Sequence, residues 1–415
     1  MAASQMRKVK LKEVCERITV GHVGPMADKY ASAGIPFLRS QNITPFRLNI
    51  EDIKYVPRDF HEKLRKSALK PGDVAVVRTG YPGTACVIPE TFHELNCADL
   101  VIITPSVALN PHYLAAIFNS AWGIASVAGN LVGVAQQHFN IGAAKDLEVQ
   151  LPPRPIQDRI AGILSAYDEL IENSQRRIKV LETMARNLYR EWFVHYRYPG
   201  NESTPLIPSP LGNIPKGWEV IKLPECVDIN PRVTVPRDGE KPFVPMGCLS
   251  NDSMIISNIE SRSGNSGAKF QNGDTLFARI TPCLENGKTG FVQFLPDGSS
   301  VAFGSTEFIV LRSRSLTPEF VYCMARSEEF RGVAIKSMSG ATGRQRVQEQ
   351  CFDDYNLAHP SRALLDQFSD IVSPSFRLIQ KLHLQTLNLR RTRDLLLPRL
   401  LSGQIPLQTP TTEAA

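Results

Sequence analysis

The sequence predicts an α+β protein with two globular domains and two long helices that pair as an antiparallel two-helix coiled coil, related by an internal pseudo-twofold duplication. Three observations lead to this fold class. Short segments recur in the same order in both halves, two heptad patterns share one register, and a stretch rich in proline, glycine and serine separates the halves. The length of 415 residues suits two or three domains.

The recurring segments mark the same landmarks in each half. VKLKEV corresponds to VIKLPE, and PGDVAVVRTG corresponds to NGDTLFARIT, with an arginine five residues after the aspartate in both: Asp73 to Arg78, and Asp274 to Arg279. A proline-led helix start follows (NPHYLAAIFNS, TPEFVYCMARS), and then a glycine-rich loop that contains glutamine (GVAQQHF, GATGRQRV). The identities are few, so the shared order carries the argument for a repeat.

Between these landmarks, runs of β-branched and aromatic residues alternate with turns of glycine, proline and asparagine. DVAVVRT and LVIITP in the first half, and TLFARIT and TEFIVLR in the second, have the composition of strands. We expect an antiparallel or mixed sheet with one or two short helices in each domain, which is an α+β arrangement.

The heptad patterns predict the long helices. From Ile160 to Trp192, apolar or small residues recur with alternating gaps of four and three, and the same gaps repeat 208 positions later, from Phe368 to Leu400. Each helix could pack on its own domain, or the two could pair. Each seam is too long for one small domain to cover, which favours pairing.

The ends of the helices and the linker set their direction. Proline bounds the first helix at Pro152 and the second at Pro360, and the linker 199–217 is short, so the second helix must run back along the first. The second seam is more polar, with Arg393 where the first has Ala185, so the halves are only approximately equivalent. The predicted boundaries are a first domain at 1–150, a central helix at 151–198, the linker at 199–217, a second domain at 218–358, a distal helix at 359–403 and a flexible tail at 404–415.

Composition narrows the class of protein. With 42% hydrophobic residues, 21% charged residues and a net charge of +6, the chain is globular and could take an anionic partner. The eight cysteines form no CxxC pair, so we expect no metal site. No apolar run is long enough to span a membrane, and the N-terminus MAASQMRKVK lacks the apolar segment of a secretory signal, so we expect a cytoplasmic protein.

No catalytic motif is complete. A P-loop would need glycine where Pro282 precedes Gly287-Lys288-Thr289, and the Pro152-Pro153 pair opens a helix rather than the target-amine loop of an amino-methyltransferase. We therefore expect a protein that recognises rather than an enzyme. Two alternatives stay open: a coiled-coil scaffold that binds no nucleic acid, and a single-chain nuclease built from scattered carboxylates.

The segments resemble the specificity (S) subunits of type I restriction-modification systems. FLRSQNI and VRTGYPG resemble their first target-recognition domain, LPPRPIQDRIAGIL and NLYREWF their central helix, LGNIPKGWEV and KFQNGDTLFARITPCLENGK their second recognition domain, and LLLPRLLSGQI their distal helix. The resemblance covers roughly residues 6–405. The distal helix departs from it, because YNLAHPSRALLDQF lacks the usual double proline.

The resemblance implies that each domain reads one half of a bipartite, asymmetric target in double-stranded DNA. It implies that the helix pair sets the spacer between the halves and docks two methyltransferase (M) subunits, which motor-nuclease (R) subunits join. It further implies that this chain is not catalytic and binds no cofactor, whereas S-adenosylmethionine, ATP and Mg²⁺ belong to the partner subunits. No membrane partner is expected.

Arginine, lysine, glutamine and asparagine read base edges in the major groove, so candidates are polar residues on loops flanked by glycine and proline. The candidates in the first domain are Arg39, Gln41, Asn42, Arg78, Thr79, Tyr81, Gln136, Gln137 and His138, and those in the second are Arg279, Thr281, Asn286, Lys288, Arg344, Gln345 and Arg346. A solvated surface residue or a turn cap is the competing interpretation for each. The aromatic cluster Tyr189, Trp192, Phe193 and Tyr196 favours core of the second domain over a docking site.

Overall fold

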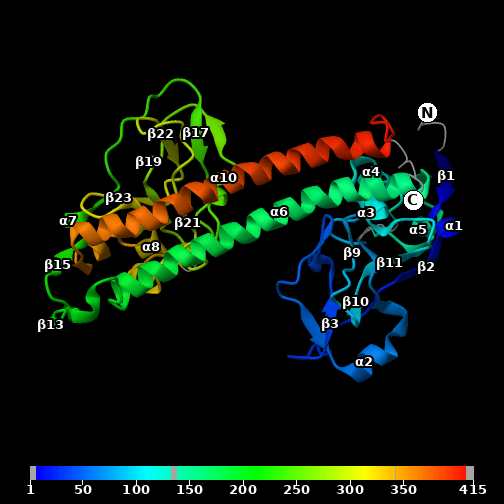
Figure 1. The fold of residues 1–415 in the computed structure, drawn as a ribbon, viewed down its shortest axis with the longest axis horizontal. Helices are drawn as coiled ribbons and strands as arrows, with labels where there is room; N and C mark the ends of the chain where they lie inside the picture. The colour runs from blue at the N-terminus through cyan, green and yellow to red at the C-terminus, as the bar shows by residue number, and fades with distance from the viewer. Residues whose placement is uncertain (1–5, 132–137, 342, 408–415) are drawn as a thin grey trace, which may run out of the picture. The chain divides into compact units, whose positions relative to one another are not determined.

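The computed structural model describes residues 6–131, 138–341 and 343–407. It separates into two compact units (Figure 1): unit 1 runs to Glu172 and resumes at Leu387, and unit 2 comprises Asn173–Thr386. The two long helices, α6 (Arg154–Tyr189) and α10 (Arg362–Leu401), each contribute a segment to both units. The predicted long helices are therefore present, and α6 fits a coiled coil.

Unit 1 contains two four-stranded sheets. One has the order β2-β11-β8-β9, with all neighbours antiparallel, and the other has the order β6-β3-β10-β7, in which β3 and β10 are parallel. A β1–β12 ladder and a short β4–β5 hairpin complete the unit. The strands are β1 (Arg7–Lys10), β2 (Cys15–Val20), β3 (Ile35–Leu38), β4 (Ile43–Thr44), β5 (Arg47–Leu48), β6 (Lys54–Val56), β7 (Ala68–Leu69), β8 (Val74–Val77), β9 (Ala85–Val87), β10 (Leu95–Cys97), β11 (Leu100–Pro105) and β12 (Glu148–Leu151).

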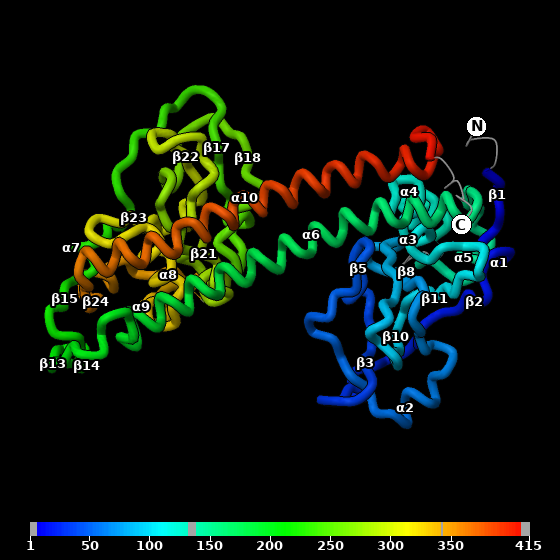
Figure 2. The backbone as a smooth tube through the Cα atoms, viewed as in Figure 1, coloured from blue at the N-terminus to red at the C-terminus, as the bar shows by residue number. Residues whose placement is uncertain are grey.

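Short helices cover the first of these sheets. α3 packs on β8 and β9, and its buried face joins the core of the sheet to the first turns of α6 and the last turns of α10, through Ile160, Leu164, Leu397 and Leu400. The sheet lies beside α3 and α6 in Figure 2. The helices are α1 (Leu11–Val14), α2 (Arg58–Lys63), α3 (Pro111–Asn119), α4 (Ala121–Ala128) and α5 (Ile141–Asp146).

Unit 2 has sheets of matching strand order. The order β16-β23-β20-β21 is antiparallel throughout, and in the order β18-β17-β22-β19 the middle pair β17 and β22 is parallel. A β15–β24 ladder corresponds in place to β1–β12. The strands are β13 (Leu206–Ser209), β14 (Gly212–Pro215), β15 (Glu219–Lys222), β16 (Val227–Ile229), β17 (Lys241–Val244), β18 (Glu260–Arg262), β19 (Ala268–Gln271), β20 (Thr275–Ala278), β21 (Thr289–Phe291), β22 (Val301–Gly304), β23 (Phe308–Ser313) and β24 (Asn356–His359).

The core of unit 2 includes the predicted aromatic cluster. Its helices are α7 (Leu223–Cys226), α8 (Pro318–Arg326) and α9 (Glu328–Lys336), with the later turns of α6 and the early turns of α10. The Phe193 ring lies 4.7 Å from Phe320, 5.0 Å from Phe368 and 6.1 Å from Trp218, measured between ring centroids. The aromatic residues that close α6 are therefore core, as the sequence predicts.

Most of the predicted strands and helices are confirmed. The runs around Val74, Leu100, Thr275 and Phe308 are strands, and both proline-led segments are helices. VKLKEV and VIKLPE are each a strand followed by one helical turn, because their hydrophobic pattern changes period midway. Within the predicted linker 199–217, β13 and β14 form a hairpin.

Candidate nucleic-acid interface

In unit 2 the structure brings together two loops that the sequence singles out separately. Thr281 donates its backbone N–H to the Gln345 carbonyl at 3.1 Å, and Gln345 donates its own to the Thr281 hydroxyl at 3.0 Å. Ile280 and Arg346 also pair across the two loops. The loop after β20 and residues 339–341 and 343–347 therefore form one surface.

The cations on this surface differ in how they are neutralised. Arg346 donates to both carboxylate oxygens of Glu307, at 2.7 to 3.0 Å, and this guanidinium lowers the pKa of Glu307. Arg279 pairs with Glu349 at 2.5 Å. Arg344 is exposed, and its side chain makes no ion pair with any residue that the structure describes. Arg344 is thus the cation of this surface most available to an anionic partner.

Two adjoining open cavities lie next to this surface and share Thr306. The larger is about 850 Å³ and the smaller about 550 Å³. Arginine and lysine supply the positive charge, Asp238 adds one carboxylate to the larger cavity, and serine, threonine and asparagine supply most of the remaining polar lining. The cationic lining residues are Arg237 and Arg262 in the larger cavity, and Arg232, Lys269 and Arg279 in the smaller one.

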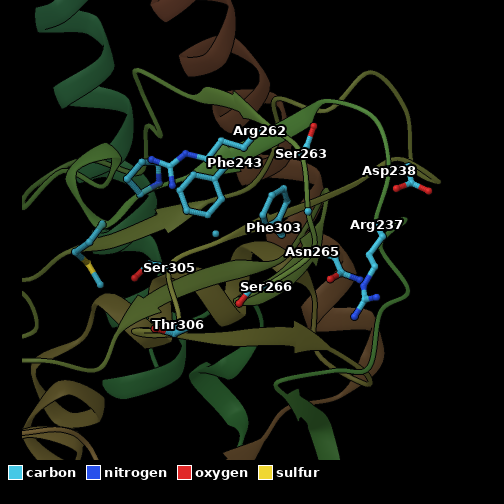
Figure 3. Close-up of a pocket in the computed structure, with 14 residues that line it drawn as sticks. Arg237, Asp238, Phe243, Arg262, Ser263, Asn265, Ser266, Phe303, Ser305 and Thr306 are labelled. Carbon is cyan, nitrogen blue, oxygen red and sulfur yellow. The ribbon is translucent and has the colours of Figure 1, made fainter.

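The walls of the larger cavity are held rigidly. Gly264 donates to the Arg237 carbonyl at 3.0 Å, and the Asn265 amide donates to the Val235 carbonyl at 3.2 Å. Figure 3 shows Arg237 and Asn265 side by side at one end, and Arg262 over the Phe243 ring, 4.0 Å from its centroid. The Arg237 backbone is therefore fixed while its side chain stays exposed, which suits a residue that contacts a ligand.

Sequence reasoning missed Arg232 and Arg237. Both follow a proline in the segment NPRVTVPRDGE between β16 and β17. A flanking proline or glycine is also the feature that indicated the other candidate loop cations. The corresponding segment after β2, GHVGPMADKYASAG, contains no arginine, so the comparison of the two halves gave no reason to choose it.

In unit 1 the loop after β3 has a different electrostatic arrangement. Arg39 donates to the Asp52 carboxylate at 3.1 Å and Gln41 at 3.2 Å. The Lys54 ammonium, which lies 2.6 Å from Asp52, and the Arg39 guanidinium lower the pKa of Asp52 to about 2. Both candidate side chains are therefore engaged by one carboxylate, which an incoming DNA acceptor would have to replace.

The loop after β8 is the second candidate in unit 1. Arg78 pairs with Asp99 at 3.1 Å, and the Thr79 hydroxyl donates to the same carboxylate at 2.6 Å. Tyr81 is 85% exposed at the tip of this loop. His138 is half-buried. Gln136 and Gln137 lie outside the residues that the structure describes.

Two candidates are better explained as structural residues. Asn42 is completely buried: it accepts from the Arg39 N–H and donates to the Asn49 carbonyl, so its amide holds a turn and cannot reach a base. Thr281 is 8% exposed and is used in the contacts with Gln345. We remove both from the candidate set.

The remaining candidates of unit 2 lie beyond these turns. Asn286 is exposed, whereas Lys288 is half-buried and donates to the Met246 carbonyl at 3.2 Å. Neither position is excluded by burial. The part of the chain that the structure describes holds no group of three His, Cys, Asp or Glu side chains placed to bind a metal ion.

Comparison with known proteins shows which family the chain resembles. Residues 4–183 match the type I restriction modification DNA specificity domain. The chain is 24% identical over 278 residues to the type I restriction enzyme MjaIX specificity subunit of Methanocaldococcus jannaschii, which covers 64% of this chain and 62% of that protein. It is 33% identical over 156 residues to the type I restriction enzyme EcoEI specificity subunit of Escherichia coli. This alignment covers 35% of this chain and 26% of that protein. Residues 4–183 are therefore assigned to this specificity-domain family, and both relatives are specificity subunits of type I restriction enzymes.

The family resemblance that the sequence motifs predict is therefore confirmed. Both alignments span less than two thirds of the relatives' own length. The type I restriction-modification system S subunit from M. genitalium has the same fold, with a TM-score of 0.59 at 13% identity, covering 95% of this chain and 96% of that chain. Within the described residues, none of the helices is long and apolar enough to cross a membrane.

Proposed function

We propose that this chain is the DNA-recognition subunit of a type I restriction-modification complex, and that each domain reads one half of a bipartite, asymmetric target in double-stranded DNA. The observation that carries the proposal, beside the family, is the open, arginine-lined surface of unit 2. Its exposed arginines, Arg237 and Arg344, have the chemistry that reads guanine in the major groove. The loops after β3 and β8 take the corresponding role in unit 1.

We further propose that α6 and α10 form an antiparallel pair that sets the spacer between the half-sites, in a chain that arose by internal duplication. In unit 1 the early residue Ile160 of α6 shares a core with the late residue Leu400 of α10. In unit 2 the late residue Ala185 shares a core with the early residue Phe368. This reversal supports an antiparallel pair, and the matching strand orders support duplication.

The partners and chemistry follow from the same proposal. The helices dock two methyltransferase subunits, and motor-nuclease subunits complete the assembly. This chain contributes sequence recognition and no catalysis, while S-adenosylmethionine, ATP and Mg²⁺ are bound by the partner subunits. The predicted domain boundaries then separate the recognition domains from the helices at 151–198 and 359–403.

The test is selection from a random library of duplex DNA, using the full chain co-expressed with methyltransferase subunits. Wild type should enrich two short motifs at a constant separation. Arg237→Ala combined with Arg344→Ala should relax only one of the motifs, because each bidentate contact contributes about 1–3 kcal/mol of base discrimination. Arg314→Ala, which removes an exposed charge of unit 2 that lines neither cavity, is the matched control and should leave both motifs intact. Recovery of no motif by wild type would overturn the proposal.

A further inference from the structure

In unit 1 the β4–β5 hairpin contacts both long helices. Phe46 occupies the turn of the hairpin with a φ of 67°. The Arg393 guanidinium of α10 lies over the Phe46 ring, 4.9 Å from its centroid, and Arg47 pairs with Glu172 of α6 at 3.3 Å. The tip of the hairpin thus contacts α10 through Phe46 and α6 through Arg47.

Arg393 is itself held firmly. It donates to Asp168 of α6 at 2.5 Å and to its neighbour Asp394 at 2.9 Å. The Arg393 side chain is only 13% exposed and that of Asp168 16%. An ion pair shielded in this way keeps its geometry better than one in water, because the surroundings screen it less. The guanidinium plane is therefore a fixed platform for the Phe46 ring.

The hairpin continues directly into the candidate reading loop. Asn42 immediately precedes β4, and its buried amide donates to the Asn49 carbonyl just after β5 and accepts from the Arg39 N–H. The backbone N–H of Asn49 returns a bond to the Asn42 carbonyl at 2.7 Å. These bonds close the base of the hairpin, so the loop that carries Arg39 and Gln41 is hydrogen-bonded to both strands that lead to the Phe46 turn.

We propose that Arg393 is a positioning residue for DNA reading by the first domain. The Asp168–Arg393 pair holds Phe46, the hairpin transmits that position to its base, and Asn42 fixes the loop that presents Arg39 and Gln41. This inference rests on the proposed DNA-recognition function. It assigns a specificity role to a polar residue in the seam of α10, far in sequence from the loop that it orients.

The test compares the two halves of the DNA motif in one selection experiment. Removing only Arg393 would leave a buried carboxylate without its cation, so both charges are removed together, by Asp168→Asn with Arg393→Met. The matched control is Glu94→Gln with Arg58→Met, which removes an exposed ion pair of unit 1 that lies off the long helices. Arg39→Ala, run in parallel, identifies the base positions that the first domain reads.

In the double variant, base discrimination should fall about tenfold at the positions that respond to Arg39→Ala, while the other half-motif stays unchanged. In the control variant, both half-motifs should stay unchanged. Phe46→Leu, which keeps the ion pair and removes the ring, should give the same one-sided loss and decides the question if the double variant does not fold.

Three results would overturn the inference: intact discrimination in a folded variant, equal weakening of both half-motifs together with a lower melting temperature, or no response to Arg39→Ala. Failure of wild type to enrich any motif is a different outcome, since it removes the proposed function and the inference with it.

Discussion

Each unit buries an aspartate before the equivalent strand, but the arginine that neutralises it comes from a different strand in each unit. Asp73 and Asp274 immediately precede β8 and β20, and each accepts the backbone N–H of the residue three positions before it. In unit 1 the cation is Arg17 on β2, 2.7 Å away. In unit 2 it is Arg312 on β23, which forms two bonds of 2.7 Å.

The strand registers show that these are exchanged positions. Arg17 lies opposite Thr104 on β11, and Arg312 lies opposite Asp228 on β16, so the arginine has changed places with the residue facing it. The buried carboxylate and its turn are the common feature, whereas either strand can supply the charge. At this buried site each unit keeps one aspartate and one arginine as partners, while the strand that carries the arginine differs.

Exchanging the positions in unit 2 is the sharpest test of that comparison. Arg312→Thr leaves Asp274, which is 1% exposed, without a cation and should cost about 3–5 kcal/mol of unfolding free energy. Adding Asp228→Arg recreates the arrangement of unit 1 and should restore most of the loss. Tryptophan fluorescence in urea reports on this unit, because Trp192 and Trp218 are both in its core.

The control for this exchange is Arg314→Thr, since Arg314 is exposed and its pair with Asp228 should contribute less than about 1 kcal/mol. If the double variant is as unstable as Arg312→Thr alone, the two strands are not interchangeable and the comparison fails.

The units also differ where the long helices end. In unit 2, Phe193 fills the space among Phe320, Phe368 and Trp218. The residue in the same register of unit 1 is Leu401, which lines an open cavity of about 800 Å³ together with residues that include Met6, Trp122 and Ser402. The same framework therefore carries a filled core in one unit and an open cavity in the other.

Exchanging these two residues should change stability in opposite directions. Phe193→Leu removes part of a buried ring and should cost about 1.5 kcal/mol in unit 2. Leu401→Phe adds volume beside a cavity and should be neutral or stabilise unit 1 by up to about 1 kcal/mol. Calorimetric melting of both variants against wild type measures the two effects. Destabilisation by Leu401→Phe equal to that of Phe193→Leu would mean that the cavity walls cannot accommodate a ring.

The sequence predicts the framework of the fold but only part of the candidate site. Hydrophobic periodicity is local, so β8, β20 and the long helices could be recognised from their own residues. Whether a polar loop residue faces solvent or caps a turn depends on packing from distant segments. Asn42 and Arg39 are three residues apart and equally polar, yet only Asn42 is fully buried.

Ion pairing is equally invisible in the sequence. Asp274 and Arg312 are 38 positions apart, and the corresponding Asp73 lies on the other side of its arginine in the chain. The arginine five residues after each aspartate pairs with Asp99 in unit 1 and with Glu349 in unit 2. A repeated motif thus predicts that a residue occupies an equivalent place without predicting its partner.

The smallest expected difference concerns the start of the proline-led helices. Asn110 caps α3 by accepting from the N–H groups of His112 and Tyr113, at 2.8 and 3.1 Å, whereas Thr317 caps α8 with one bond of 3.4 Å to Phe320. Asn110→Ala should therefore cost about 1 kcal/mol and Thr317→Ala about 0.5 kcal/mol, in urea unfolding of each variant. Asn110→Ser is the control, because serine keeps an acceptor at the cap and should recover most of the loss. If Thr317→Ala proves the more costly change, the buried threonine stabilises unit 2 through packing rather than through its cap, and the two helix starts are equivalent in sequence only.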